Sequence, residues 1–380
     1  MVSGQRSCYS LKRMQKPTSG IDGLLLLTVV ALSLFGFMMV ASASSVLAER
    51  FHSDALFFFR HQFFFGGIVG LVAFLIGIFV PYRAWRVLAL PGLIISLLLL
   101  VLVFVPGLSV ASGGAARWIG IGPITIQPSE ITKLAFIVYL SALLEAKGED
   151  IRNLRQSVLP FVAIMAVIGT LIILQPDIGT LLSIVLIASA MAFAAGFRLR
   201  HLAGLGLAGI ALFAVLVNVA SYRLNRIIVY LHPELDPEGL GYQINQALLA
   251  VGTGGVWGLG FGRSRQKYQF LPEPAGDSIF AIIAEELGLI RTSFVLALFA
   301  IIAWRGYRIA LRAPDTLGRL LATGITSWIV SQAFINIGSI LGVTPLTGIP
   351  LPFISYGGSA LVTMLFATGI LLNISRHQVT

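Results

Sequence analysis

Three carboxylates mark the stretch 264–288, where a basic loop leads into an apolar run long enough to cross a membrane. Asp277 lies at the start of that run, and Glu285 and Glu286 lie within it. An ionised side chain at the middle of a bilayer costs at least about 2.5–3.5 kcal/mol. Such groups are therefore expected either to be paired in the protein interior or to line a wet cavity.

The spacing of the three carboxylates determines the angles between them about the axis of an ideal helix. At about 100° per residue, Glu285 lies within about 80° of Asp277, and Glu286 lies about 180° away. Asp277 and Glu285 can thus face one cavity, whereas Glu286 is expected to meet a partner inside the helix bundle. Asp277 has an alternative role as a helix N-cap, because a carboxylate favours a helix N-terminus.

A second charged group surrounds the segment 107–129, which precedes another apolar run. Glu130 and Lys133 are three residues apart and can pair on one helix face, and Arg117 precedes them. Two interpretations stay open. The pair is either a structural ion pair that closes the outer end of the helix, or part of an anion site in which Lys133 and Arg117 meet a phosphate group.

Two more polar segments interrupt the apolar runs. Asp177 directly precedes a predicted helix, so it is either an N-cap or a residue that lines the same cavity. The segment 347–359 contains Pro350, Pro352 and the hydroxyl of Ser355. Broken helices at membrane depth are tolerated inside a protein or around a cavity, so this segment is predicted to form a further wall of an outer pocket.

The composition settles the broad class. Of the 380 residues, 57% are hydrophobic and 11% charged, whereas soluble domains have about 25% charged residues. The net charge of +10 comes from dispersed basic residues, which argues against nucleic-acid binding and for membrane topology or anionic substrates. The single cysteine, Cys8, excludes an internal disulfide and a thiolate metal cluster. Five histidines, none of them near Asp277, leave any metal site unknown.

We therefore predict an all-α polytopic membrane protein with about ten transmembrane helices. Apolar runs of suitable length occur at about 21–43, 61–80, 84–106, 130–146, 157–174, 178–197, 201–220, 278–304, 317–342 and 351–374. Most lysines and arginines fall into alternate loops, which places both termini in the cytoplasm. Residues 1–20 then form a cytoplasmic tail, 21–374 the membrane domain and 375–380 a short cytoplasmic C-terminus.

The segment 221–277, between the seventh and eighth runs, is too long for an ordinary connection. Its apolar and aromatic content argues against disorder, so a partly folded extracytoplasmic loop that partly re-enters the membrane is expected. Arg223, Arg226 and Lys267 add positive charge on this outer side. Its glycine run, 252–262, lacks the GlyLys pair of a phosphate-binding loop but allows close backbone approach.

Together these segments resemble the SEDS family of FtsW and RodA, and the resemblance extends from about Gly23 to Arg376. The most specific motifs are Ala-Arg-Trp with Gln-Pro-Ser-Glu-x-x-Lys at 116–133, Gln-Pro-Asp-x-Gly-Thr at 175–180 and Tyr-Gln-x-x-Gln at 242–246. Two further motifs are Leu-Pro-Glu, Asp-x-Ile-Phe-Ala and Glu-Glu-Leu-Gly in order at 271–288, and Thr-Gly-Ile-Pro-Leu-Pro-Phe-Ile-Ser-Tyr-Gly-Gly-Ser at 347–359. The sequence at 264–267 is more similar to the FtsW, division-type branch. Ala275-Gly276 before Asp277, and Arg291, depart from the family pattern.

The resemblance implies a peptidoglycan glycosyltransferase that polymerises lipid II at the outer face of the bacterial cytoplasmic membrane. It implies an inverting mechanism in which Asp277 is the general base. The substrate-binding residues that we expect on this basis are Arg117, Glu130, Lys133, Asp177, Arg223, Arg226, Tyr242, Gln243, Lys267, Glu285 and Ser355. The sequence shows no ligand set for a cofactor, although a divalent cation (Mg or Mn) is chemically reasonable beside a pyrophosphate leaving group.

The resemblance also implies partners: a class B penicillin-binding protein with transpeptidase activity, other division proteins and the lipid bilayer. Three alternatives stay open. The chain could be a lipid II flippase or transporter without chemistry, an elongation-type polymerase like RodA, or a non-catalytic scaffold for division proteins.

Overall fold

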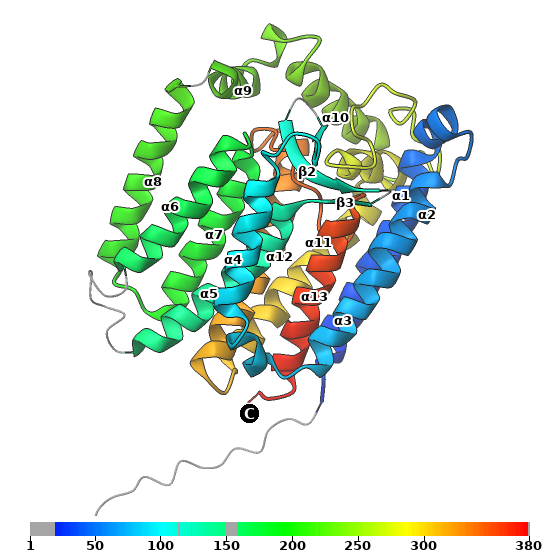
Figure 1. The fold of residues 1–380 in the computed structure, drawn as a ribbon. Helices are drawn as coiled ribbons and strands as arrows, with labels where there is room; N and C mark the ends of the chain where they lie inside the picture. Colours follow the sequence, from blue (N-terminus) through cyan, green and yellow to red (C-terminus); the bar gives the residue numbers. More distant parts are fainter. Residues whose placement is uncertain (1–19, 113–114, 123, 149–157, 220, 379–380) are drawn as a thin grey trace, which may run out of the picture.

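The computed structural model describes residues 20–112, 115–122, 124–148, 158–219 and 221–378, and most of them are helical (Figure 1). The first half of the chain forms α1 (Gly23–His52), α2 (Phe57–His61), the π-helix η1 (Gln62–Ile68), α3 (Val69–Phe79), the 3-10 helix η2 (Tyr82–Arg86), α4 (Ala89–Leu102), α5 (Pro128–Lys147), α6 (Leu159–Leu174) and α7 (Ile178–Ala195). The second half forms α8 (Leu199–Val219), α9 (Ser221–Leu231), the 3-10 helix η5 (Pro233–Leu235), α10 (Leu240–Gly254), α11 (Ile279–Leu311), α12 (Thr316–Ile340) and α13 (Gly358–Ser375).

Six helical stretches of the described chain are long and apolar enough to cross a membrane. They are Gly23–His52, Phe57–Phe79, Ile178–Ala195, Ile279–Leu311, Thr316–Ile340 and Gly358–Ser375. Three shorter apolar helices accompany them, at Ala89–Leu102, Leu159–Leu174 and Leu199–Val215. Each apolar run expected from the sequence thus contains helix, and the fold is that of a multi-pass membrane protein.

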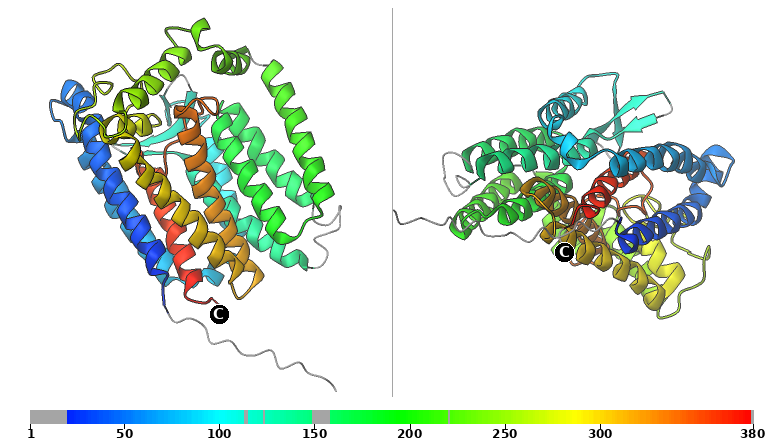
Figure 2. Two further views of the ribbon diagram at one scale, coloured as in Figure 1. Left: turned by 180° about the vertical axis from the view of Figure 1, so that it is seen from behind. Right: turned by 90° about the horizontal axis from the view of Figure 1, so that it is seen from below.

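Helix α12 lies at the centre of the bundle. It packs against α5, α7 and α11, and nearly its whole length is buried. Gly324 permits the close approach of α5 and α7, because a Cβ there would lie 2.7 Å from an Ile137 methyl and 2.8 Å from the Met191 sulfur. The view from behind in Figure 2 shows α11 crossing obliquely, with contacts to α1 and to α12.

A small antiparallel sheet follows α4, so the expectation of an all-α chain is wrong in this segment. Its strands, β1 (Ser109–Ser112), β2 (Ala115–Ile121) and β3 (Ile124–Ile126), pair in the order β1-β2-β3. Ile119 pairs with Ile126 and is buried. Alternating β-branched residues favour such a half-buried strand pair, but the segment is too short for this pattern to stand out in the sequence.

Helix α11 is broken at Gly288, where φ is 72° and ψ is 177°. The glycine-rich segment after α10 binds the backbone groups around the break. Leu259 N and Gly260 N donate to Glu285 O and Glu286 O at 3.0 and 2.9 Å, and Leu289 N donates to Gly255 O at 2.9 Å. These bonds keep the polar groups of a broken helix satisfied, as a buried backbone requires.

The break corrects the predicted eighth span, 278–304, which ran through Gly288. At about 1.5 Å per residue, the part from Leu289 to Leu311 is about 34 Å long, enough to cross a hydrocarbon core of about 30 Å. Glu285 and Glu286 therefore lie before the part of α11 that can span the membrane. They do not lie within it.

Gly288→Ala is expected to lower the free energy of unfolding by about 1–3 kcal/mol, because a non-glycine residue is strained at this φ. A Cβ at this position would also lie 2.2 Å from Gly258 N. Thermal unfolding in detergent measures the effect, and Gly92→Ala is the matched control because open space surrounds Gly92. Equal unfolding temperatures for the two variants would contradict this account of the break.

The elements that connect the long apolar helices gather largely at one end of the bundle. The sheet, α9, α10 and the loop that leads into α11 lie at the upper end in Figure 1. The start of α1 and the end of α13 lie at the opposite end. The folded segment 221–277 expected from the sequence is present, with α9 and α10 as its main elements.

Candidate active site

Asp277 lies in the loop between α10 and α11, directly before the helix. Ser278 is the N-cap residue of α11 and makes no side-chain capping bond. The N-cap interpretation of Asp277 is therefore wrong. The backbone amides that act on the carboxylate are those of Asp277 and Ser278, which precede the first residue of α11.

The main chain around Asp277 is held at three consecutive carbonyls. Tyr356 N donates to Ala275 O at 2.8 Å. Ser355 Oγ donates to Gly276 O at 2.7 Å, and Asn336 Nδ2 donates to Asp277 O at 2.7 Å. The donors come from α12 and from the irregular segment before α13, so these two parts of the chain fix the position of the loop.

The side chain of Asp277 is less tightly bound than its backbone. Its Oδ1 is shielded from solvent and has no hydrogen-bond partner among the described residues. Gly348, with φ 70°, lies beside Oδ2, and a Cβ built on it would be 3.6 Å from that oxygen. A glycine here leaves space next to the carboxylate.

Burial raises the pKa of Asp277, which lies outside the membrane-spanning segments, to about 6. The negative charge of Glu273 raises this pKa further, while neighbouring backbone amides and the charge of Arg226 lower it. Asp277 is therefore mainly ionised at pH 7 and becomes protonated just below pH 6. A carboxylate with such a pKa is suited to accept a proton near neutral pH.

Polar residues of α9 and α10 lie close to this loop. Arg226 in α9 donates from Nη1 to Leu346 O at 3.2 Å, which places it near Gly348 and Asp277. Gln243 in α10 donates from Nε2 to Ser278 Oγ at 3.1 Å, and its neighbour Tyr242 is partly buried. Arg223 falls within α9, but its side chain lies outside the described residues.

Ser355 has two structural bonds. Its hydroxyl accepts from Leu351 N at 2.8 Å and donates to Gly276 O. That the segment before α13 lines an outer pocket stays a prediction, although its Gly348 lies beside Asp277. Ser355 thus holds both the Asp277 loop and a turn of this segment. Its suggested role in binding substrate stays a prediction.

Glu285 does not share the surroundings of Asp277 in the way that an ideal helix suggested. Its carboxylate accepts from Ser264 Oγ and from Arg265 N, the latter at 2.9 Å. It therefore fixes the loop after the glycine-rich segment. The ideal-helix estimate was wrong because Asp277 precedes the first residue of α11.

Glu286 and Lys267 form a buried ion pair, with 3.3 Å between Nζ and Oε1. Ser42 of α1 donates to both oxygens of Glu286, and Lys267 Nζ also donates to Gly262 O at 2.6 Å. The expected partner of Glu286 inside the bundle is confirmed. Lys267, which we expected to contact substrate, joins the loop after the glycine-rich segment to Ser42 of α1 and Glu286 of α11.

Arg117 and Asp177 meet at the turn between α6 and α7. Arg117 donates from Nε to Gln175 O at 3.2 Å and from Nη2 to Pro176 O at 2.5 Å. Asp177 is the N-cap of α7, as one interpretation held, and accepts from Thr180 N at 3.0 Å. The next residues touch the segment beside Asp277, since a Cβ at Gly179 would lie 2.9 Å from Thr347 O.

Glu130 and Lys133 form the predicted ion pair, with 2.7 Å between Nζ and Oε1. Lys133 is fully buried, and its Nζ also donates to Gln332 Oε1 at 2.7 Å. The ring of Trp328 lies 5.1 Å from Nζ. Lys133 is thus enclosed by protein groups, which favours the structural interpretation over a direct contact with a phosphate.

Sequence reasoning missed the polar face of α12. Gln332 donates from Nε2 to Pro350 O at 3.0 Å, and Asn336 donates to Ile349 O at 2.8 Å as well as to Asp277 O. A signal was available, because Trp328, Gln332 and Asn336 recur every four residues and so lie on one face of a helix.

The residues that the structure describes contain no group of three histidine, cysteine or acidic side chains that could hold a metal ion. The divalent cation allowed by the chemistry therefore has no evident protein ligand set in this part of the chain.

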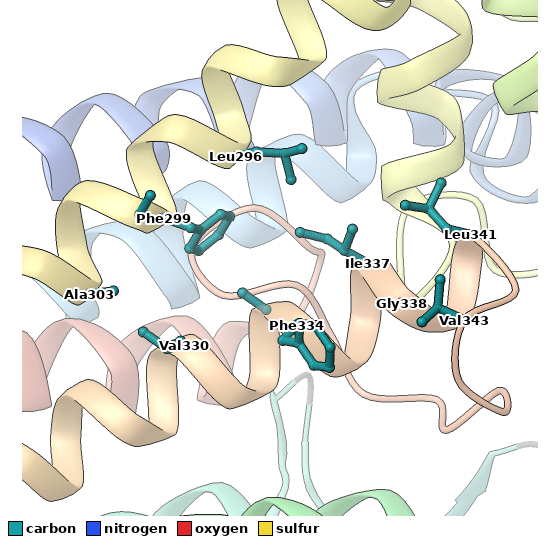
Figure 3. A pocket seen from close by; sticks show the side chains of 11 residues that line it. Leu296, Phe299, Ala303, Val330, Phe334, Ile337, Gly338, Leu341 and Val343 are labelled. Carbon is teal, nitrogen blue, oxygen red and sulfur yellow. The ribbon is translucent and has the colours of Figure 1, made fainter.

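An apolar groove of about 280 Å³ lies between α11 and α12 (Figure 3). Leu296 and Phe299 of α11 and Phe334 and Ile337 of α12 line it, with Val343 at one end. The Phe334 side chain is 63% exposed. The groove is formed by the membrane-spanning part of α11, well separated in the chain from the polar loop at Asp277.

The comparison with known families decides the membership of the chain. The model of a family of cell cycle proteins, FtsW, RodA and SpoVE, matches residues 23–380. The chain belongs to the FtsW, RodA and SpoVE family. The resemblance predicted from the motifs is thereby confirmed.

Curated relatives within the FtsW, RodA and SpoVE family match nearly the full chain. Stage V sporulation protein E of Bacillus subtilis is 46% identical over 357 residues, which covers 94% of this chain and 97% of that protein. A probable peptidoglycan glycosyltransferase FtsW of Trichlorobacter lovleyi is 42% identical and covers 96% of each chain.

Two solved structures have the same fold. One is a chain of a peptidoglycan synthase complex whose structure describes the coordination of polymerization and crosslinking. Its TM-score is 0.78, and it is 29% identical over 94% of this chain and 98% of that chain. The rod shape determining protein RodA of Thermus thermophilus has a TM-score of 0.69 and 27% identity over 95% of this chain and 98% of that chain.

Proposed function

We propose that the protein is a peptidoglycan glycosyltransferase that polymerises lipid II into glycan strands, with Asp277 as the general base. The proposal is based on the way in which the Asp277 loop is held and its carboxylate is left available. Its backbone is held by three donors, while the carboxylate is partly buried with Oδ1 left without a partner. Family membership and the named activity of the FtsW relatives supply the substrate class.

The reaction joins two glycosyl units without a covalent intermediate on the protein. The 4-hydroxyl oxygen of the acceptor sugar bonds to the anomeric carbon of the donor, and the bond from that carbon to the pyrophosphate oxygen breaks. Asp277 accepts the hydroxyl proton, and the pyrophosphate leaves with the bonding electron pair. Because an α-linked donor gives a β-linked product, the step is a single inversion.

Arg226 is the cation that we place beside the leaving pyrophosphate. Its charge already acts on Asp277, and its bond to Leu346 O holds it next to Gly348. A preorganised cation stabilises charge that develops in the transition state. Arg117 is bonded to main-chain carbonyls of the turn between α6 and α7, and Lys133 and Lys267 are paired with buried carboxylates, so we assign these three cations to positioning the surrounding loops. Arg226 also has protein partners, and we choose it because its charge acts on Asp277.

We propose ten membrane spans, both termini in the cytoplasm and the Asp277 site at the outer face of the bacterial cytoplasmic membrane. The grouping of the polar loops at one end of the bundle, opposite the described chain ends, supports this arrangement. The basic residues of the loops at the other end support it as well.

Reconstitution tests the proposal. The purified protein in liposomes that contain lipid II is expected to release glycan polymer, which muramidase digestion identifies. Translocation of lipid II without polymer would favour a flippase. A scaffold would be favoured by two results together. The purified protein would neither polymerise nor translocate lipid II, and a variant with its charged site residues neutralised would still complement a division defect.

A membrane-spanning helix of a class B transpeptidase is the partner that we propose for the groove between α11 and α12. The similar chain within a peptidoglycan synthase complex supports a partner of this kind. The exposed apolar lining supports a contact within the membrane, because helices in a membrane associate by close packing and the lining side chains contain no polar group.

Ala300→Trp fills this groove and is expected to reduce co-purification of the transpeptidase from native membranes at least about tenfold, the result of losing about 1.4 kcal/mol of binding. Leu207→Trp, at an exposed position on α8, is the matched control and is expected to leave co-purification unchanged. Equal recovery of the partner by both variants would exclude the groove as the contact surface.

A further inference from the structure

The buried polar face of α12 reaches the Asp277 loop. Trp328, Gln332 and Asn336 are spaced four residues apart, so their side chains follow one face of the helix. All three are almost completely buried. Polar side chains in a membrane-embedded interior are costly unless they satisfy other buried polar groups, and here each has a specific partner.

Asn336 joins two segments that are distant in the sequence. Its Nδ2 donates to Asp277 O at 2.7 Å and to Ile349 O at 2.8 Å. Both acceptors are main-chain carbonyls, so a single amide group binds the two segments to each other. The bond to Ile349 O lies directly beside Gly348, the residue next to the Asp277 carboxylate.

Gln332 fixes the other end of this arrangement. Its Nε2 donates to Pro350 O at 3.0 Å, and its Oε1 accepts from Trp328 Nε1 at 2.8 Å and from Lys133 Nζ at 2.7 Å. Two successive carbonyls, Ile349 O and Pro350 O, are therefore bound by two successive polar turns of α12. The wall beside Asp277 is held in register with the helix and with the Glu130–Lys133 pair.

We propose that Asn336 is a positioning residue for Asp277, which it holds at a fixed place relative to the wall at Gly348 and Ile349. This inference rests on the proposed function, because it assigns Asn336 a role in the proton transfer to Asp277. Asn336 donates to backbone carbonyls and, in the described part of the chain, makes no hydrogen bond to the Asp277 carboxylate. Loss of its donor leaves both carbonyls without this partner and releases the loop.

Lipid II polymerisation by Asn336→Ala is the first measurement. We expect kcat to fall on the order of 10- to 100-fold, because a displacement of about 1 Å can cost a factor of that size. KM is expected to change less than threefold, since the side chain does not contact substrate. Asn336→Ser keeps one donor, which can hold one of the two carbonyls, and is expected to give an intermediate kcat.

Asn373 supplies a matched control. This buried asparagine of α13 donates to Ile78 O at 2.7 Å and accepts from Tyr82 N at 2.9 Å, at the opposite end of the bundle from Asp277. Asn373→Ala removes an equally buried amide and reports the effect of lost stability alone. Equal losses of kcat in Asn373→Ala and Asn336→Ala, at equal unfolding temperatures, would overturn the proposal.

Hydrogen exchange separates this inference from the proposed function, because it requires no activity. Amides of residues 275–279 are expected to exchange faster in Asn336→Ala, and to a smaller degree in Asn336→Ser, than in the wild type or Asn373→Ala. Unchanged exchange in both Asn336 variants would overturn the positioning role even if the wild type polymerises lipid II. If the wild type has no polymerase activity but the Asn336 variants still exchange faster than it does, the proposed function is rejected and the structural link between Asn336 and the Asp277 loop is kept.

Discussion

Asp277→Asn is expected to reduce lipid II polymerisation by about 10²- to 10⁴-fold, the usual contribution of a positioned general base. The substitution keeps the shape of the side chain and removes its ability to accept the proton. Binding of lipid II is expected to change little, because the neighbouring groups remain. Polymerisation of purified lipid II by the variant measures the effect, and activity within a few-fold of the wild type would reject Asp277 as the base.

The pH dependence gives a second signature of the same residue. Because the pKa of Asp277 is about 6 and the ionised form is the base, the wild-type rate is expected to fall as the pH drops through about 6. Glu273 raises that pKa by its charge. Glu273→Gln is therefore expected to move the acid limb of the rate profile to lower pH while the rate at pH 8 is retained.

Stability separates loss of chemistry from loss of folding in Asp277→Asn. The folded-state pKa of Asp277 is raised above its ordinary value of 3.8, so this group stabilises the fold fully below that value and the contribution is lost as pH rises through about 6. At pH 8 the wild type contains a disfavoured buried charge. The asparagine variant is thus expected to unfold at a temperature equal to or above that of the wild type.

The parts of the site that could be predicted are those set by local spacing. The spacing of three from Glu130 to Lys133 predicted their pair, and the position of Asp177 before a helix allowed its N-cap role. The direction of Glu286, away from Asp277, predicted a partner within the bundle, which is Lys267 with Ser42. Such features depend on one helix and its nearest residues.

The parts that could not be predicted depend on contacts between distant segments. The break at Gly288 is stable because the segment after α10 supplies donors and acceptors to it, and a glycine within an apolar run does not reveal such a partner. The same holds for the Asp277 loop, whose carbonyls bind Asn336, Ser355 and Tyr356. Its family motifs identified Asp277, whereas the bonds that hold it required the fold.

Lys133→Met is expected to destabilise the protein by about 3–5 kcal/mol, because it leaves the buried carboxylate of Glu130 without its countercharge. Glu130 is 1% exposed, its Oε1 accepts from Lys133, and its Oε2 has no hydrogen-bond partner among the described residues. The yield of folded protein and the unfolding temperature in detergent measure this loss.

The double variant Glu130→Gln with Lys133→Met is the control for this prediction, because it removes both charges together. Replacement of a whole buried pair by neutral groups of similar volume is often close to neutral for stability. We therefore expect the double variant to recover most of the unfolding temperature, with Trp328 still donating to Gln332. A double variant as unstable as Lys133→Met would contradict the ion-pair account. Polymerisation by the recovered protein then separates the two roles of Lys133: restored activity identifies a structural pair, and persistent loss identifies a contribution to the pyrophosphate site.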